Sequence, residues 1–207
     1  MFDRNELIQL SEDLTYALTD LYEYKVVFSN DPERLSLLNN TAPFFFVKLY
    51  KYYWDEFIMS ISRFTDPGVQ RNFKNLSILS LKEYSDLLPP DGKAKFLSNL
   101  DTIVVEAEII RNYRNKNISH RSKEAQVIIP EKMETFNVDK VEKIYTLIED
   151  CLNIFYGFFD NTTEFHGPII ITHGAQTMLN YLSEGKLFEE MTDKSQMLKM
   201  TQPQEST

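Results

Sequence analysis

The sequence predicts an all-α protein, an antiparallel bundle of four to five helices with a short helical C-terminal extension. Three observations favour this fold class. Apolar residues recur at steps of three and four along most of the chain, strand-like alternation is nearly absent, and only six of the 207 residues are glycine. With 43% hydrophobic residues, a chain of this length buries a large core without metal or disulfide support. Long amphipathic helices with short connections pack by default as an antiparallel bundle.

Four long stretches carry the helical spacing, and turn-forming residues separate them. The predicted long helices are residues 4–29, a helix whose apolar stripe covers 47–64, residues 91–115, and a helix after Asn137 whose stripe covers 138–159. Asn30-Asp31-Pro32 ends the first of them, and Thr65-Asp66-Pro67-Gly68 ends the second. Asn137 is the expected N-cap of the fourth. We expect the apolar stripes of these helices to be core and assign no chemistry to them.

The remaining segments are shorter. We expect a loop at residues 68–76, a short helix at 76–88, and a last short helix at 176–191. Two pieces, residues 125–130 and 165–174, look extended, and their pairing is left open. The predicted division is a bundle over residues 1–160, a loop and short helix over 161–191, and a polar tail over 192–207.

A cationic segment interrupts this acidic chain. Residues 111–123, RNYRNKNISHRSK, contain no acid, whereas the whole chain has a formal net charge of -9. The cations of the segment are Arg111, Arg114, Lys116, Arg121 and Lys123. The overall charge argues against a protein that coats nucleic acid, but it leaves room for a local phosphate contact.

Arg114 continues the buried face of its predicted helix, because it lies four residues after Ile110. An unpaired charge in that position would cost several kcal/mol. Two interpretations follow. Arg114 forms a structural ion pair, with Asp55 and Asp66 as candidate partners, or it faces a polar cleft where its planar fork suits phosphate.

His120 lies six residues after Arg114, which corresponds to about 240° around an ideal helix. The two side chains therefore converge only if the helix ends or bends between them. The run Asn115-Lys116-Asn117 favours such an end, because asparagine is a poor helix former. A neutral imidazole placed there could act as a general base.

The residues from Arg114 to His120 resemble the Arg-x(4–6)-His motif of the HEPN superfamily, with Asn115 matching the polar residue that often follows the arginine. Residues 54–57, 60–67 and 75–77 resemble the AbiU-type abortive-infection branch of that superfamily. The resemblance covers about residues 5–160.

This resemblance implies a compact helical homodimer that acts as a metal-independent endoribonuclease of a toxin–antitoxin or phage-defence system. Arg114 and His120 would be catalytic, in a composite site near the twofold axis, and Asn115 would orient the phosphate or the imidazole. The flanking phosphates would bind to Arg111, Lys116, Arg121 and Lys123. The implied partners are RNA and, in a toxin–antitoxin system, an antitoxin protein, with no DNA, no membrane, no metal and no cofactor.

Arg63 and Asp66 admit two interpretations. In the first, they form an ion pair or a contact at the end of their helix that fixes the following loop. In the second, they contact and orient the residues of the Arg114 site. In neither case do we expect them to be catalytic.

Two other functions stay open. The chain could be a non-catalytic helical dimer that binds a partner protein, RNA or a nucleotide through the same cleft. It could instead be a small-molecule enzyme or sensor with a pocket lined by Tyr50, Tyr52, Tyr53 and Trp54, although a bulky core explains these residues more simply. Glu164, His166 and His173 could together hold a metal, but we expect no metal site.

The sequence also gives an expectation for localisation. No stretch approaches the ~18 apolar residues that cross a bilayer, and the N-terminus lacks a basic region followed by an apolar one. Cys151 is the single cysteine and has no partner for an intramolecular disulfide. We expect a soluble, cytoplasmic protein.

Overall fold

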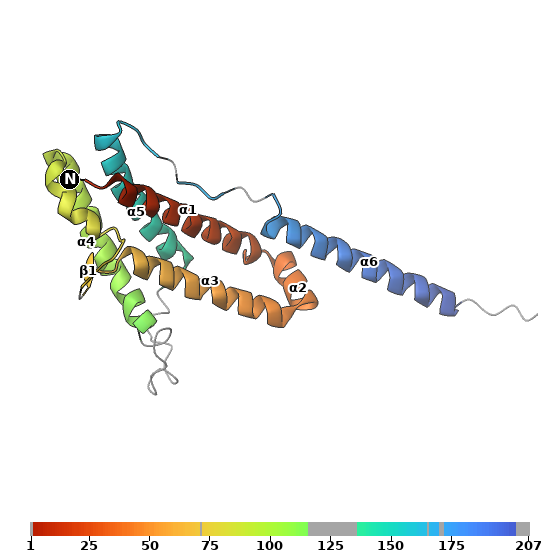
Figure 1. Ribbon diagram of the computed structural model, residues 1–207. Helices are drawn as coiled ribbons and strands as arrows, with labels where there is room; N and C mark the ends of the chain where they lie inside the picture. The colour runs from red at the N-terminus through yellow and green to blue at the C-terminus, as the bar shows by residue number, and fades with distance from the viewer. Residues whose placement is uncertain (1, 71, 116–135, 165, 170–171, 202–207) are drawn as a thin grey trace, which may run out of the picture. The chain divides into compact units, whose positions relative to one another are not determined.

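The computed structural model describes residues 2–70, 72–115, 136–164, 166–169 and 172–201, with residues 195–201 described by their backbone alone. Within these residues the chain is mostly helical, which confirms the all-α class (Figure 1). The elements are α1 (Arg4–Val27), α2 (Pro32–Thr41), α3 (Pro43–Phe64), β1 (Val69–Gln70), β2 (Phe73–Lys74), the 3-10 helix η1 (Ser80–Leu87), α4 (Pro90–Tyr113), α5 (Val138–Phe159) and α6 (Ala175–Thr201).

The chain divides into two compact units. Unit 1 comprises Met1–Leu21 and Tyr52–Ile169, and unit 2 comprises Tyr22–Lys51 and Ile170–Thr207. Helices α1 and α3 therefore each contribute residues to both units. The sequence-based division at residues 160 and 191 stays a prediction, and α6 continues through residue 191 without interruption.

Unit 1 is built around the antiparallel pair α4 and α5. Phe96, near the start of α4, packs edge-on against Phe155, near the end of α5, with ring centroids 5.1 Å apart. At the other end of the pair, the Nζ of Lys143 lies 2.8 Å from the Oε1 of Glu106. The predicted N-cap of α5 is confirmed, because the Oδ1 of Asn137 accepts a hydrogen bond from the N–H of Lys140 at 3.1 Å.

Unit 2 has a small apolar core of its own. Its buried members are Val27, Leu38, Phe46, Ala175 and Leu179. The N-terminus of α6 is fixed by Glu23, whose carboxylate accepts a hydrogen bond from the N–H of Ala175 at 2.6 Å. A Cβ at Gly174 would lie 2.5 Å from that carboxylate, so a larger residue there would require the Glu23 side chain to shift.

Helix α2 was missing from the sequence-based prediction. Asp31 and Pro32 were assigned as a stop for the preceding helix, but they also begin the next one. The side chain of Asp31 accepts a hydrogen bond from the N–H of Glu33 at 3.0 Å, and Pro32 occupies the first helical position. With only Leu38 buried, the ten residues of α2 carry too short an apolar stripe to be recognised by periodicity.

Other boundaries also differ from the prediction. Helix α3 begins at Pro43 rather than at residue 47, and α6 is longer than residues 176–191 at both ends. The predicted loop at residues 68–76 contains the two-stranded antiparallel pair of β1 and β2. Residues 125–130, one of the two extended pieces, lie outside the described residues. Of the other piece, residues 166–169 are irregular, and α6 begins at residue 175.

Candidate functional site

Arg111 and Arg114 lie in the last turn of α4 and just after it. The helix buries one face through Phe96, Leu100, Ile103, Ala107 and Ile110. Arg114 follows this face by one more step of four, as expected, and only 17% of its side chain is exposed. Its backbone N–H still bonds to the carbonyls of Ile110 and Arg111, so the regular helix carries the side chain to this position.

A fixed turn after α3 supplies the carboxylate that meets Arg114. The buried hydroxyl of Thr65 donates to the carbonyl of Ile61 at 2.8 Å, and the N–H of Asp66 bonds to the carbonyl of Arg63 at 3.3 Å. The side-chain amide of Asn75 donates to the carbonyl of Pro67 at 2.8 Å. Because these bonds hold the turn from both sides, Asp66 projects from a well-defined backbone.

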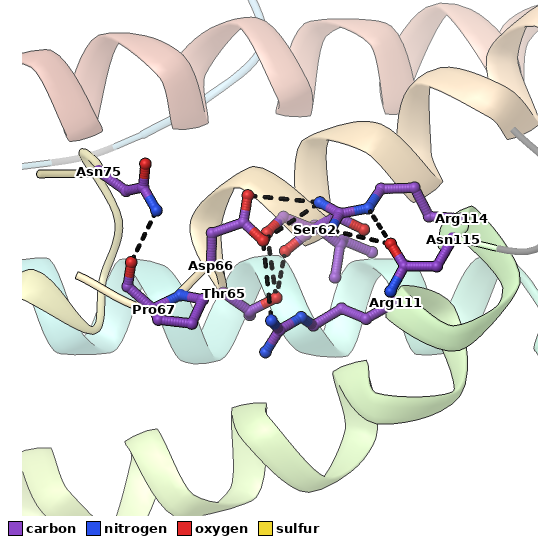
Figure 2. A network of polar contacts seen from close by, with 9 residues as sticks. Ser62, Thr65, Asp66, Pro67, Asn75, Arg111, Arg114 and Asn115 are labelled. Atoms are coloured by element: carbon purple, nitrogen blue, oxygen red, sulfur yellow. Dashed lines mark hydrogen bonds and ion pairs between the residues drawn. The ribbon is translucent and has the colours of Figure 1, made fainter. Parts of the chain in front are cut away.

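Asp66 and Asn115 together hold the guanidinium of Arg114. The Nη1 of Arg114 lies 3.1 Å from Oδ1 and 3.3 Å from Oδ2 of Asp66. The Nε and Nη2 of Arg114 each lie 3.2 Å from the Oδ1 of Asn115. Arg111 approaches the same carboxylate, with its Nη2 3.8 Å from Oδ1 of Asp66. Figure 2 shows Asp66 between the two arginine side chains.

This arrangement leaves positive charge and hydrogen-bond donors available. Two arginines share one carboxylate, so the three side chains carry a net charge of about +1. A guanidinium has five N–H donors, and the described contacts of Arg114 are four hydrogen bonds, one from Nε, two from Nη1 and one from Nη2. One donor of Arg114, on Nη2, is therefore not used by the part of the chain that the structure describes. An anion such as a phosphate can accept a hydrogen bond from this donor.

The structure decides between the two candidate partners of Arg114, because Asp66 makes the contact. Arg63 is held elsewhere, and its Nη2 lies 2.5 Å from the Oε1 of Glu56 on the same helix. Asp66 therefore contacts Arg114 directly, whereas Arg63 forms its ion pair within α3. The sequence analysis had treated Arg63 and Asp66 as one pair. It did not predict the hydrogen bond from Asn75 to Pro67, although Asn75 belongs to the residues that resemble the AbiU-type branch.

Four of the predicted site residues cannot be placed. His120, Lys116, Arg121 and Lys123 lie outside the described residues. The predicted convergence of His120 with Arg114 therefore stays a prediction.

Neither His166, a candidate metal ligand, nor the single cysteine, Cys151, lies in an environment that favours chemistry. The backbone N–H of His166 bonds to the carboxylate of Glu149 at 3.0 Å, and its buried ring lies 3.5 Å from the same carboxylate. Over the described residues, no group of three or more His, Cys, Asp or Glu side chains is arranged to hold a metal ion. Burial raises the pKa of the Cys151 thiol to about 12, which disfavours the reactive thiolate.

The four aromatic residues of α3 that could line a pocket differ in their surroundings. Tyr50 packs edge-on against Phe28 with ring centroids 5.3 Å apart, although 44% of it is exposed. Trp54 packs edge-on against Phe57 and Phe136, at 5.8 and 5.5 Å. The contacts of Trp54 support the simpler explanation, a bulky core, whereas Tyr52 is 65% exposed.

No helix among the described residues combines the length and apolar character needed to cross a membrane.

The helical fold and the position of Arg114 at the end of the third long helix agree with the resemblance to HEPN-type proteins. Residues 4–166 match the HEPN_AbiU2 family model, described as AbiU2, and the chain belongs to this family. The match confirms the resemblance drawn from the sequence, and it ends before α6. No curated protein and no solved structure matches the chain.

Proposed function

We propose that this protein is a metal-independent endoribonuclease of a toxin–antitoxin or phage-defence system, active as a homodimer. The observation that carries the proposal is the Arg114 guanidinium, oriented by Asp66 and Asn115 with one N–H donor that no described residue uses, in a chain of the HEPN_AbiU2 family. The acidic remainder of the surface suits a protein that contacts RNA only at one place.

The reaction needs only the chemistry of these side chains. The 2′-oxygen of a ribose attacks the adjacent phosphorus, the 2′-O–P bond forms, and the P–5′-O bond breaks. His120 of one protomer takes the 2′-OH proton, and His120 of the other gives a proton to the leaving 5′-oxygen. The products are a 2′,3′-cyclic phosphate and a free 5′-hydroxyl.

Arg114 and its neighbours supply the electrostatic part. A preorganised guanidinium stabilises the extra negative charge of the phosphorane-like transition state, and Asp66 and Asn115 have already fixed its orientation. Asn115 holds Arg114 through its oxygen, which leaves its NH2 group for the phosphate. Arg111, Lys116, Arg121 and Lys123 bind flanking phosphates without selecting bases.

The test is cleavage of single-stranded RNA by the purified full-length chain in the presence of EDTA. We expect His120→Ala and Arg114→Ala each to lower the cleavage rate by at least about a hundredfold. Lys93→Ala serves as the matched control, because it removes a cation that bonds to Asp86 elsewhere on the surface. A DNA strand of the same sequence, which lacks the 2′-hydroxyl, should stay intact.

Two results would overturn the proposal: cleavage that survives in both variants, or no cleavage of any RNA tested. A chain that stays monomeric while it cleaves would overturn the composite site alone.

The runner-up is a non-catalytic helical dimer that binds RNA or another partner through the same site. One observation favours it, namely that Asp66 and Asn115 already occupy three nitrogens of Arg114, as in a structural ion pair. It predicts RNA binding that falls with Arg114→Ala but never produces a cyclic phosphate.

A further inference from the structure

Helix α6 carries an exposed apolar face beyond the core of unit 2. Its first turns pack into that core, but from residue 183 to residue 194 no residue is buried. Four large residues on one side of the helix are each more than half exposed, namely Tyr181, Leu187, Phe188 and Met191. At 100° per residue, Glu184 lies within about 10° of the centre of this face. The α6 face is therefore apolar with a carboxylate in its middle.

The start of α3, which also belongs to unit 2, carries a second exposed apolar face. The large members of this α3 face, each more than half exposed, are Phe44, Phe45 and Val47. The exposed residues Lys48 and Lys51 lie about 40° and 20° around the helix from Phe44, on either side of it. The α3 face is therefore apolar with ammonium groups in its middle.

The sequence around each face has the matching charge. Residues 34–54 contain no Asp or Glu, in a chain that has 31 of them, whereas residues 183–193 contain four acids and one lysine. That lysine, Lys186, bonds to Glu189 at 2.9 Å on the opposite side of α6. Within the part of the chain that the structure describes, neither Lys48 nor Glu184 forms an ion pair. Each face thus presents a charge for which the other face has the opposite sign.

This complementarity selects a second copy of the chain as the partner. Both faces are exposed in the same copy, so they do not cover each other within one chain. An anionic surface would suit the α3 face and repel the α6 face, whereas a second copy suits both. A twofold axis makes the contact reciprocal, because α6 of each copy then covers α3 of the other.

The contact also explains how the second half of α6 is stabilised. Isolated helices are marginally stable in water, and most helical stability in proteins comes from packing an apolar face. Gly185 has no atom within 4 Å of the position of its missing Cβ and weakens this stretch further. Apolar burial would supply most of the affinity, and the ion pair between Glu184 and Lys48 would fix the register and disfavour other partners.

We propose that two copies of this chain associate reciprocally, with the α6 face of each packed on the α3 face of the other and Glu184 opposite Lys48. The contact uses α6, which begins after the residues that match the HEPN_AbiU2 family, and it does not depend on the proposed ribonuclease activity.

The experiment is sedimentation of the full-length chain over a range of concentrations. We expect Lys48→Glu and Glu184→Lys each to weaken one association step by about tenfold, because each replaces two attractions by two repulsions. An equal mixture of the two variants should regain the wild-type constant within about threefold, since both contacts of the mixed dimer again join opposite charges. Glu190→Lys makes the same charge change about 120° away from the α6 face and should leave the constant unchanged.

A cross-link separates this contact from any dimer formed through the Arg114 site. Under mild oxidation, a mixture of Lys48→Cys and Glu184→Cys chains should form a covalent dimer on a non-reducing gel, and neither variant alone should do so. The native Cys151 is fully buried and does not compete. The proposal is overturned if the chain does not associate, if the single charge reversals have no effect, or if mixing them fails to restore association. Cross-linking of Glu184→Cys alone would overturn it as well, because α6 would then contact α6.

Discussion

Arg114 is held more tightly than a surface arginine, and its two neighbours explain why. Its side chain is mostly buried, and a carboxylate on one edge and an amide on another fix the plane of the guanidinium. Little entropy remains to be lost when a phosphate binds, which is the advantage of a preorganised site. The same carboxylate would repel a phosphate, so Asp66 orients Arg114 and would also oppose the proposed binding of RNA.

The residue-scale prediction follows from these two opposing roles. Asp66→Asn keeps the shape of the side chain but removes its charge. We expect the rate of RNA cleavage to fall about tenfold, because Arg114 is less well oriented, and the affinity for RNA at low salt to rise. Single-turnover kinetics and filter binding measure the two quantities separately.

The matched control for this variant is Glu56→Gln. It removes the carboxylate that bonds to Arg63 on the same helix and leaves Asp66 in place. An unchanged cleavage rate in Asp66→Asn, or an equal loss in both variants, would contradict the assigned role of Asp66.

At the scale of the element, α4 carries both a row of buried core residues and, at its C-terminal end, the two arginines of the candidate site. Its buried stripe packs in unit 1, and its polar side bonds to α5 through Glu106, Lys143 and Lys140. The hydrogen bond from Lys143, aided by both lysine charges and opposed by partial burial, lowers the pKa of Glu106. This contact connects the end of α4 that bears Arg111 and Arg114 to the start of α5.

The element-scale prediction concerns the pH dependence of this contact. Because folding lowers the pKa of Glu106, its stabilising contribution is fully present above the unfolded pKa near 4.5 and is lost as the pH falls through the lower folded value. Lys143 is more than half exposed, so solvent screening limits the contribution to about 0.5 kcal/mol.

Urea unfolding at pH 6 and at pH 3 measures this contribution. Glu106→Gln should lower the free energy of unfolding at pH 6 and have a smaller effect at pH 3. Asp101→Asn, which changes an exposed carboxylate on the same helix, provides the comparison. A Glu106→Gln effect of equal size at both pH values would exclude the ionic contact as its cause.

At the scale of the whole molecule, two units with separate cores share one chain. The buried side chains of α4 and α5, with those of the unit 1 parts of α1 and α3, form the core of unit 1. Those of α2, α6, the start of α3 and Val27 of α1 form the core of unit 2. The candidate site lies entirely within unit 1.

The whole-molecule prediction tests whether the cores are independent. Leu179→Ala removes a buried side chain of unit 2 and should cost about 2–5 kcal/mol. Hydrogen exchange should then show lower protection in α2 and α6, with α4 and α5 little changed. Ile103→Ala should give the reverse pattern, whereas uniform loss in either variant would indicate one cooperative unit.

The sequence by itself determined the elements whose signals are local. The steps of three and four along α1, α3, α4 and α5 predicted the long helices, and the position of Arg114 four residues after Ile110 predicted a partly buried charge in need of a partner. Asn137 was recognisable as a cap because capping depends on neighbouring residues alone. The family, too, followed from motifs within the chain.

Only the tertiary structure decided which carboxylate meets Arg114, because Asp55 and Asp66 fit the sequence equally well and the choice depends on how α3 and α4 pack. It also separated Arg63 from Asp66 and showed that α2 exists, since a ten-residue helix with one buried leucine owes its stability to the core it joins. Contacts between residues distant in sequence depend on packing, and no local pattern encodes them.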